Sequence, residues 1–137
     1  MVECPTSVTT TASARIDPID GGIVSLGGTS VVFLGGEVLE PIIVELTIPA
    51  SRYVEIRLRA AREADGTPLD KFEKSVLVTI DYRRCTRTDV LSKPVTAWYI
   101  NSDTKALINE MVGTFDNKLT RSVAFPTIHF SGYAIAF

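Results

Sequence analysis

Two stretches of this chain alternate apolar and polar residues with a period of two, and that pattern constrains the fold more than any other feature of the sequence. Residues 41–49 and 53–59 carry aliphatic side chains at their even positions. Successive side chains of a β-strand point to opposite faces of a sheet, so this alternation predicts antiparallel strands with one buried face. The aliphatic positions are Ile42, Val44, Leu46, Ile48, Val54, Ile56 and Leu58.

Three further segments, residues 76–82, 95–100 and 118–125, predict strands less cleanly, and Gly-Gly, Asp-Gly and Asn-Ser-Asp turns separate them. Helical periodicity is weak. Residues 104–112 are compatible with a short helix or with a hairpin loop followed by a strand. We therefore expect an all-β fold, an antiparallel β-sandwich of about seven to nine strands with little or no helix.

The N-terminal residues differ in composition from the rest of the chain. Residues 1–15 contain few large apolar side chains and many serines and threonines. Such a segment buries little surface to offset the entropy of ordering it, so we expect a flexible leader over residues 1–15 and one β-sandwich domain over residues 16–137. Two cysteines define no pairing pattern. The sequence therefore leaves open whether Cys4 and Cys85 form a disulfide, which requires the leader to fold back.

Charge and hydropathy argue against several kinds of partner. The formal net charge is −2, and acidic and basic residues are interleaved along the chain. This is unlike the basic patch that binds nucleic acid or an anionic membrane. No apolar run approaches the roughly 18 residues needed to span a bilayer. No signal peptide is evident, so we expect either a cytoplasmic chain or a mature or truncated piece of an exported protein.

Several motifs occur in a recognisable order. A Gly21-Gly22 turn opens a strand, an apolar-Thr-Ile-Asp-Tyr strand lies at residues 76–82, an aromatic segment lies at 93–105, and a His-Phe-Ser-Gly-Tyr motif lies at 129–133. In this order the motifs resemble the ZU-five domain shared by zonula occludens proteins, the netrin receptor Unc-five and ankyrins. The turn at residues 34–37 departs from that pattern, because it lacks the family's usual proline and alanine.

The resemblance covers residues 16–137 and implies an antiparallel β-sandwich. For the bacterial branch of the family it also implies an exported, non-enzymatic module, outside the cell or in the cell envelope. We therefore expect a structural or protein-interaction module with a protein or glycan partner at the cell surface and no cofactor. Function follows from a site more than from a fold, so the functional prediction depends on individual residues.

The His-Phe-Ser motif is the first candidate site. Some eukaryotic relatives cleave their own chain between its Phe and Ser, which by resemblance makes His129 the base, Phe130 the residue before the cleaved bond and Ser131 the nucleophile. An N→O acyl shift would give an ester that water hydrolyses, with the imidazole accepting the serine proton. In a regular closing strand over residues 127–137, however, His129 and Ser131 share one face and Phe130 points into the core. We favour this structural role.

Aromatic residues form the second candidate site, for a glycan or a protein. Trp98 and Tyr99 are adjacent, so a strand directs one of them into the core and the other outward. Tyr53, Arg57 and Arg59 could join such an outer face, although alternating charges usually only keep a sheet face hydrated. The single histidine and two cysteines show no metal-ligand spacing, and the Gly-Gly pairs lack phosphate-binding spacing, so we expect no metal site.

Overall fold

The computed structural model describes all 137 residues as an antiparallel β-sandwich, which confirms the all-β prediction. Strands account for 57% of the residues and helix for 4%. There are thirteen strands, more than the expected count, because short strands pair at the edges of the two large sheets and form a third, two-stranded sheet. The one helix, α1 (Thr88–Ser92), lies outside the segment considered for a helix. That segment contains β10 (Leu107–Glu110), as the alternative of a hairpin loop and strand predicted.

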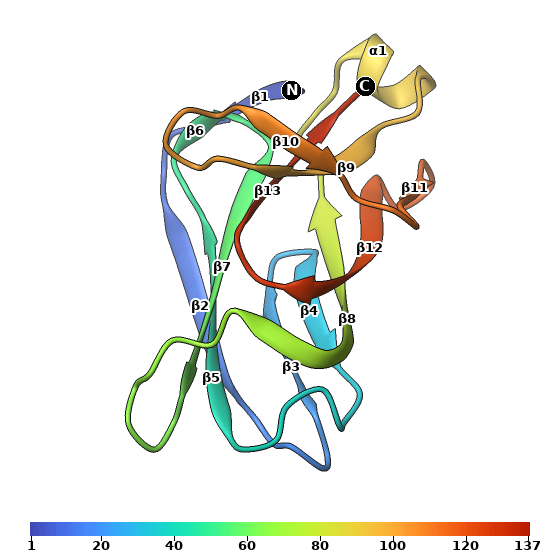
Figure 1. Cartoon of the computed structure of the whole chain (residues 1–137). Helices are drawn as coiled ribbons and strands as arrows, with labels where there is room; N and C mark the ends of the chain where they lie inside the picture. The colour runs from blue at the N-terminus through green and yellow to red at the C-terminus, as the bar shows by residue number, and fades with distance from the viewer.

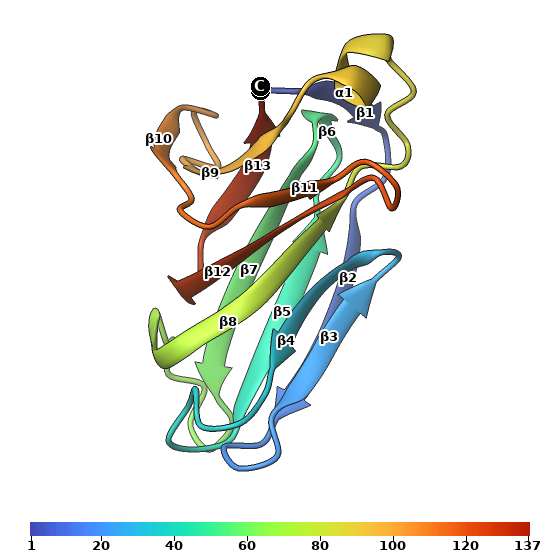
Figure 2. The same cartoon turned by 90° about the vertical axis from the view of Figure 1, so that its right-hand side faces the viewer.

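Two sheets pack face to face (Figure 1). In sheet order, the six-stranded sheet contains β10, β9 (Thr96–Ile100), β13 (Gly132–Ala136), β7 (Glu55–Arg62), β5 (Ile42–Ile48) and β2 (Thr10–Ile16). The five-stranded sheet contains β11 (Phe115–Asn117), β12 (Ser122–His129), β8 (Lys71–Asp81), β4 (Thr29–Phe33) and β3 (Gly22–Leu26). Figure 2 shows the five-stranded sheet in front of the other. A third sheet pairs β1 (Glu3–Thr6) with β6 (Ser51–Tyr53) at the end where both termini lie.

The core lies between the two large sheets and follows the alternation in the sequence. Ile42, Val44 and Leu46 of β5 are fully buried. Val78 of β8 and Phe125 of β12 face them from the other sheet and are equally buried. Each such side chain contributes about 1.5–3 kcal/mol to the free energy of folding, so the alternating strands account for much of the stability.

Residues 1–15 are not a flexible leader, and that prediction is wrong. β1 pairs with β6, and β2 pairs with β5 along its full length. The Val2 side chain is fully buried, its N–H donates to the Ile135 carbonyl at 2.9 Å, and its carbonyl accepts from the Val54 N–H at 3.1 Å. Backbone pairing with distant strands and burial of a few apolar side chains offset the ordering entropy, and local composition reveals neither of these contributions.

Cys4 and Cys85 form a disulfide, which settles the pairing that the sequence left open. Both residues are buried, at 6% and 1% exposure. The loop after β8 also holds β1 through hydrogen bonds, because Arg84 Nε donates to the Cys4 carbonyl at 2.9 Å and Arg87 Nη1 donates to the Glu3 carbonyl at 3.3 Å. The N-terminal strand is therefore fixed covalently and by side chains far away in sequence.

Two glycines close the opposite end of the sandwich, as the Gly-Gly turn interpretation predicted. Gly21 has a φ of +73°, and a Cβ there would lie 2.0 Å from the Phe33 carbonyl oxygen. Gly35 has a φ of +119°, and a Cβ there would lie 2.2 Å from the Ile19 carbonyl oxygen. Only glycine tolerates these conformations at such close approach. The turn before β3 and the turn after β4 therefore pack directly against each other.

Candidate functional site

The His-Phe-Ser motif lies where the chain crosses from one sheet to the other. β12 ends at His129 and β13 begins at Gly132, so the single closing strand expected over residues 127–137 is wrong. The Phe130 ring packs edge to face against Phe72 and Phe33, at centroid distances of 4.6 and 6.1 Å. This cluster of three aromatic rings forms inside the sandwich, and it anchors the crossover between the two strands.

The His129 imidazole contacts tyrosines and makes no hydrogen bond with the Ser131 hydroxyl. Its Nδ1 atom lies 3.3 Å from the Tyr133 hydroxyl, and its ring meets Tyr99 edge to face at 5.3 Å. The Tyr133 hydroxyl donates to the His129 carbonyl at 2.5 Å and lies 3.0 Å from Thr127 Oγ1. Burial raises the pKa of Tyr133 to about 12, so its hydroxyl keeps its proton through the neutral range.

The backbone on either side of the Phe130–Ser131 bond is hydrogen-bonded to other segments, and the bond is trans. Neither residue has a positive φ. The Phe130 N–H donates to the Asp70 carbonyl at 3.3 Å, and the Ser131 carbonyl accepts from the Leu58 N–H at 2.9 Å. The structure therefore brings His129, Phe130 and Ser131 together without an imidazole–hydroxyl hydrogen bond and without left-handed strain. The direct imidazole–hydroxyl hydrogen bond by which a base activates a serine is therefore not formed here.

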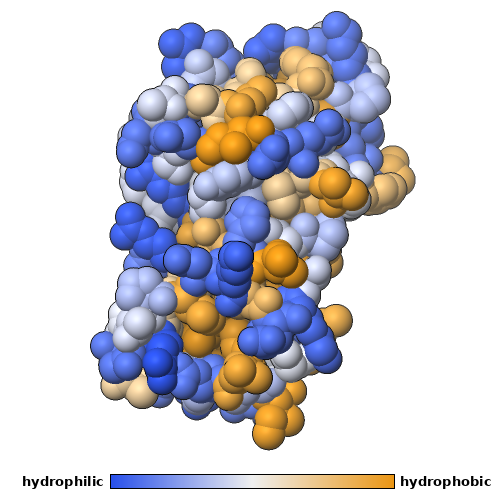
Figure 3. Space-filling model, viewed as in Figure 1, coloured by the Kyte–Doolittle hydropathy of each residue, from blue (hydrophilic) through white to orange (hydrophobic).

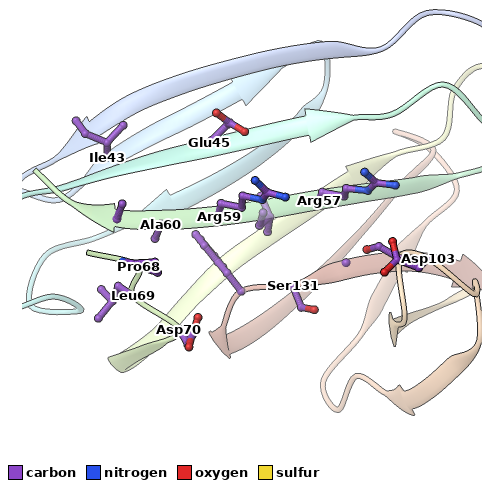
Figure 4. A pocket seen from close by; sticks show the side chains of 15 residues that line it. Ile43, Glu45, Arg57, Arg59, Ala60, Pro68, Leu69, Asp70, Asp103 and Ser131 are labelled. Atoms are coloured by element: carbon purple, nitrogen blue, oxygen red, sulfur yellow. The ribbon is translucent and has the colours of Figure 1, made fainter. Parts of the chain in front are cut away.

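Phe130 and Ser131 line an open groove of about 700 Å³ on the outer side of the six-stranded sheet. β7 supplies its base, with Arg57 and Arg59 side by side (Figure 4). Glu45 comes from the neighbouring strand β5, Asp70 from the β7–β8 loop and Asp103 from the β9–β10 loop. The groove thus collects charged side chains from four separate parts of the chain.

The two groove arginines differ from most other arginines of the chain. Neither Arg57 nor Arg59 lies within 4.0 Å of a carboxylate oxygen, and neither makes a side-chain hydrogen bond. Arg57 Nε is buried and has no acceptor. Five arginines elsewhere form ion pairs: Arg15, Arg52, Arg62, Arg83 and Arg87. The alternation in residues 53–59 indicated that these arginines face outward, but it could not indicate that they lack partners.

The aromatic residues proposed as a binding face do not meet on one surface. Tyr99 faces the interior beside His129 and Tyr133, whereas Trp98 lies in register with Ala134 on the outer face and is half-buried. The prediction that Trp98 and Tyr99 point to opposite faces is confirmed. Tyr53 lies on β6 under the Arg52 guanidinium, and no ring contact joins it to either of the others. The structure separates the three residues.

A second surface, the outer face of the five-stranded sheet, is uncharged at its centre. Two rows of residues in register cross its strands. One row contains Ile23, Val32, Leu77 and Pro126, and the other contains Ser25, Ser30, Thr79, Ala124 and Phe115. Ile23, Leu77 and Phe115 are 56%, 46% and 64% exposed. Orange hydrophobic residues project along the right-hand side of Figure 3, the side on which this sheet lies in Figure 1. We call these two rows the uncharged face.

Comparison with known proteins adds no family assignment. No protein-family model matches the chain, and a search of curated proteins finds no match. Within the structure, no helix has the length and hydrophobicity needed to cross a membrane. No cluster of three or more His, Cys, Asp or Glu side chains has the arrangement of a metal site. Candidate functions therefore depend on the geometry of the groove and of the uncharged face.

Proposed function

We propose that this chain is a non-catalytic structural and protein-interaction module that associates through the uncharged face. The observation that carries the proposal is the absence of charge from both rows that cross the five-stranded sheet. A solvated antiparallel sheet usually alternates buried apolar residues with polar, often charged, outer ones. The outer face of the other sheet has this usual character, with Glu45 in register with Arg59.

The composition of the uncharged face suits a second copy of the same chain. Its polar groups in the second row are the hydroxyls of Ser25, Ser30 and Thr79. A hydroxyl both donates and accepts hydrogen bonds, so a row of hydroxyls is complementary to itself, and no like charges meet across a two-fold axis. Five strands about 4.8 Å apart span roughly 20 Å, which corresponds to a small interface and a weak dimer.

The proposal also includes an exported, bacterial, ZU-five-like module. The order of motifs in the sequence supports the family resemblance, and the antiparallel sandwich is the fold that the resemblance implies. The Cys4–Cys85 disulfide supports export, because disulfides persist in oxidising compartments outside the cytoplasm.

Self-association is the direct test of the uncharged face. In sedimentation velocity over a concentration series, we expect the average mass to rise with concentration from the monomer towards the dimer. Leu77→Lys should keep the chain monomeric at every concentration, because it places a charge at the centre of the interface. Val8→Lys is the matched control, since Val8 is 63% exposed in the β1–β2 loop and should leave the association unchanged. A wild-type chain that stays monomeric at millimolar concentration contradicts the proposal.

The absence of self-cleavage has a separate test. Denaturing mass spectrometry of the purified chain, after prolonged incubation at neutral pH, should show a single species at the intact mass of 14.9 kDa. The reason is that the His129 ring nitrogen contacts the Tyr133 hydroxyl and not Ser131, and that neither Phe130 nor Ser131 has a positive φ. Ser131→Ala is the control and should give the same pattern. Release of a Ser131–Phe137 peptide from the wild type alone would establish the autoproteolytic alternative.

A further inference from the structure

The groove over β7 holds two cationic side chains at a spacing set by the strand itself. Arg57 and Arg59 are two residues apart on β7, and both line the groove (Figure 4). Residues at alternate positions of a strand project from the same face about 6.6–6.8 Å apart. In a ligand that lies over this face as an extended strand, the side chains at alternate positions point to the same side and have the same spacing.

The groove contains a hydrogen-bond donor that the chain does not satisfy. Arg57 Nε is buried without an acceptor, and the Ser102 and Ser131 hydroxyls line the same groove. A buried donor left without an acceptor costs free energy, so an acceptor that enters the groove and pairs with Arg57 Nε is stabilised. Among common side chains, a carboxylate is the best acceptor for a guanidinium group, because both are planar and can form two parallel hydrogen bonds.

The acidic and apolar residues around the two arginines determine which kind of anionic ligand fits the groove. Glu45, Asp70 and Asp103 line the same groove and repel a uniformly charged polyanion such as a nucleic acid or a sulfated chain. Ile43, Pro68 and Leu69 add apolar surface. The one aromatic ring in the lining, Phe130, packs edge to face against Phe72 and Phe33, so no freely exposed ring face is offered to a sugar. Isolated carboxylates on a partly apolar, extended chain fit these constraints.

We infer that the groove binds an extended segment of another protein whose carboxylates, at alternate positions, pair with Arg57 and Arg59. This inference concerns the six-stranded sheet and is independent of the uncharged face on the other sheet. The segment lies along β7, with its two carboxylates directed at the guanidinium groups. Its remaining side chains contact Ile43, Pro68 and Leu69.

Fluorescence anisotropy with labelled synthetic peptides tests the spacing. Each peptide carries two glutamates in a threonine- and valine-rich host, either adjacent, separated by one residue or separated by two. At an ionic strength of about 0.15 M, where distant charges are screened, the peptide with one intervening residue should bind tightest. Replacing both glutamates by glutamine should remove the binding. Arg57→Gln and Arg59→Gln should each weaken it about tenfold, as expected for the loss of one charge-assisted hydrogen-bonded pair.

Arg83→Gln is the matched control, because it removes the same charge from the turn after β8, where Arg83 pairs with Asp81. It should leave peptide binding unchanged. Arg57→Lys keeps the charge and loses the planar fork, so it should bind with intermediate affinity, and it also serves if Arg57→Gln does not fold. Binding that is undetectable, that ignores the glutamate spacing or that falls equally in Arg83→Gln overturns the inference. So does binding of a uronic acid oligosaccharide, dependent on Arg57 and Arg59, in place of the peptides.

Discussion

A chain in which alanine replaces both Cys4 and Cys85 should lose about 4.5 kcal/mol of unfolding free energy at 25 °C. The bond joins residues 81 apart in sequence. Cross-linking so long a loop removes many conformations from the unfolded chain, which is the main source of the stabilisation. Domains of this kind are stable by only about 5–15 kcal/mol in total, so the loss is a large fraction. Urea unfolding followed by tryptophan fluorescence measures it, with Trp98 as the single reporter.

A reductant provides the control for the disulfide, because it opens the bond without changing the buried volume. The wild-type chain should unfold at a lower urea concentration in reducing buffer, whereas the double alanine variant should unfold at the same concentration in both buffers. Hydrogen exchange should show that the amides of Val2 and Val54, which hold the N-terminal strand in place, lose protection first. Identical midpoints for the oxidised and reduced wild-type chains would show that the disulfide adds no stability.

Lys105→Met should cost about 3 kcal/mol of unfolding free energy, because it leaves a buried carboxylate without its cation. The Glu55 side chain is completely buried, and Lys105 Nζ lies 2.6 Å from its Oε1 atom. Ser51 Oγ donates to Oε2 at 2.9 Å and becomes the only remaining side-chain partner. The Lys105 side chain retains 30% exposure, so water reaches the vacated position, and we place the cost at the lower end of the range for broken buried pairs.

The double variant Glu55→Gln/Lys105→Met tests whether the pair itself accounts for the cost. An amide at position 55 keeps a hydrogen-bond acceptor for Ser51 and carries no charge, so the double variant should be more stable than Lys105→Met alone. Thermal unfolding of the wild type, both single variants and the double variant gives the coupling energy directly. Lys118→Met breaks the Lys118–Asp116 pair, in which the Asp116 side chain is 9% exposed, and serves as a second comparison. A loss below about 1 kcal/mol in Lys105→Met, typical of exposed pairs, would contradict the assignment.

The role of Lys105 depends on contacts that its local sequence does not indicate. Nothing in residues 101–106 distinguishes this lysine from the other charged residues of the chain, yet its backbone has a φ of +64° and its side chain reaches a strand 50 residues earlier. The same holds for Arg57 and Arg59. Their outward orientation follows from the alternation around them, whereas the absence of ion-pair partners depends on where Glu45, Asp70 and Asp103 are placed by other segments.

The sequence by itself determined the strands that form the centre of the fold and the side chains that they bury. The period-two pattern around Val44 and Ile56 is a local property, because each residue's face of the sheet is set by its immediate neighbours in the strand. Tertiary structure decided the rest. Four features depend on partners far away in sequence. They are the ordered conformation of residues 1–15, the Cys4–Cys85 bond, the crossover at Phe130 and Ser131, and the groove arginines without ion-pair partners. Their energies come from contacts that no local pattern records.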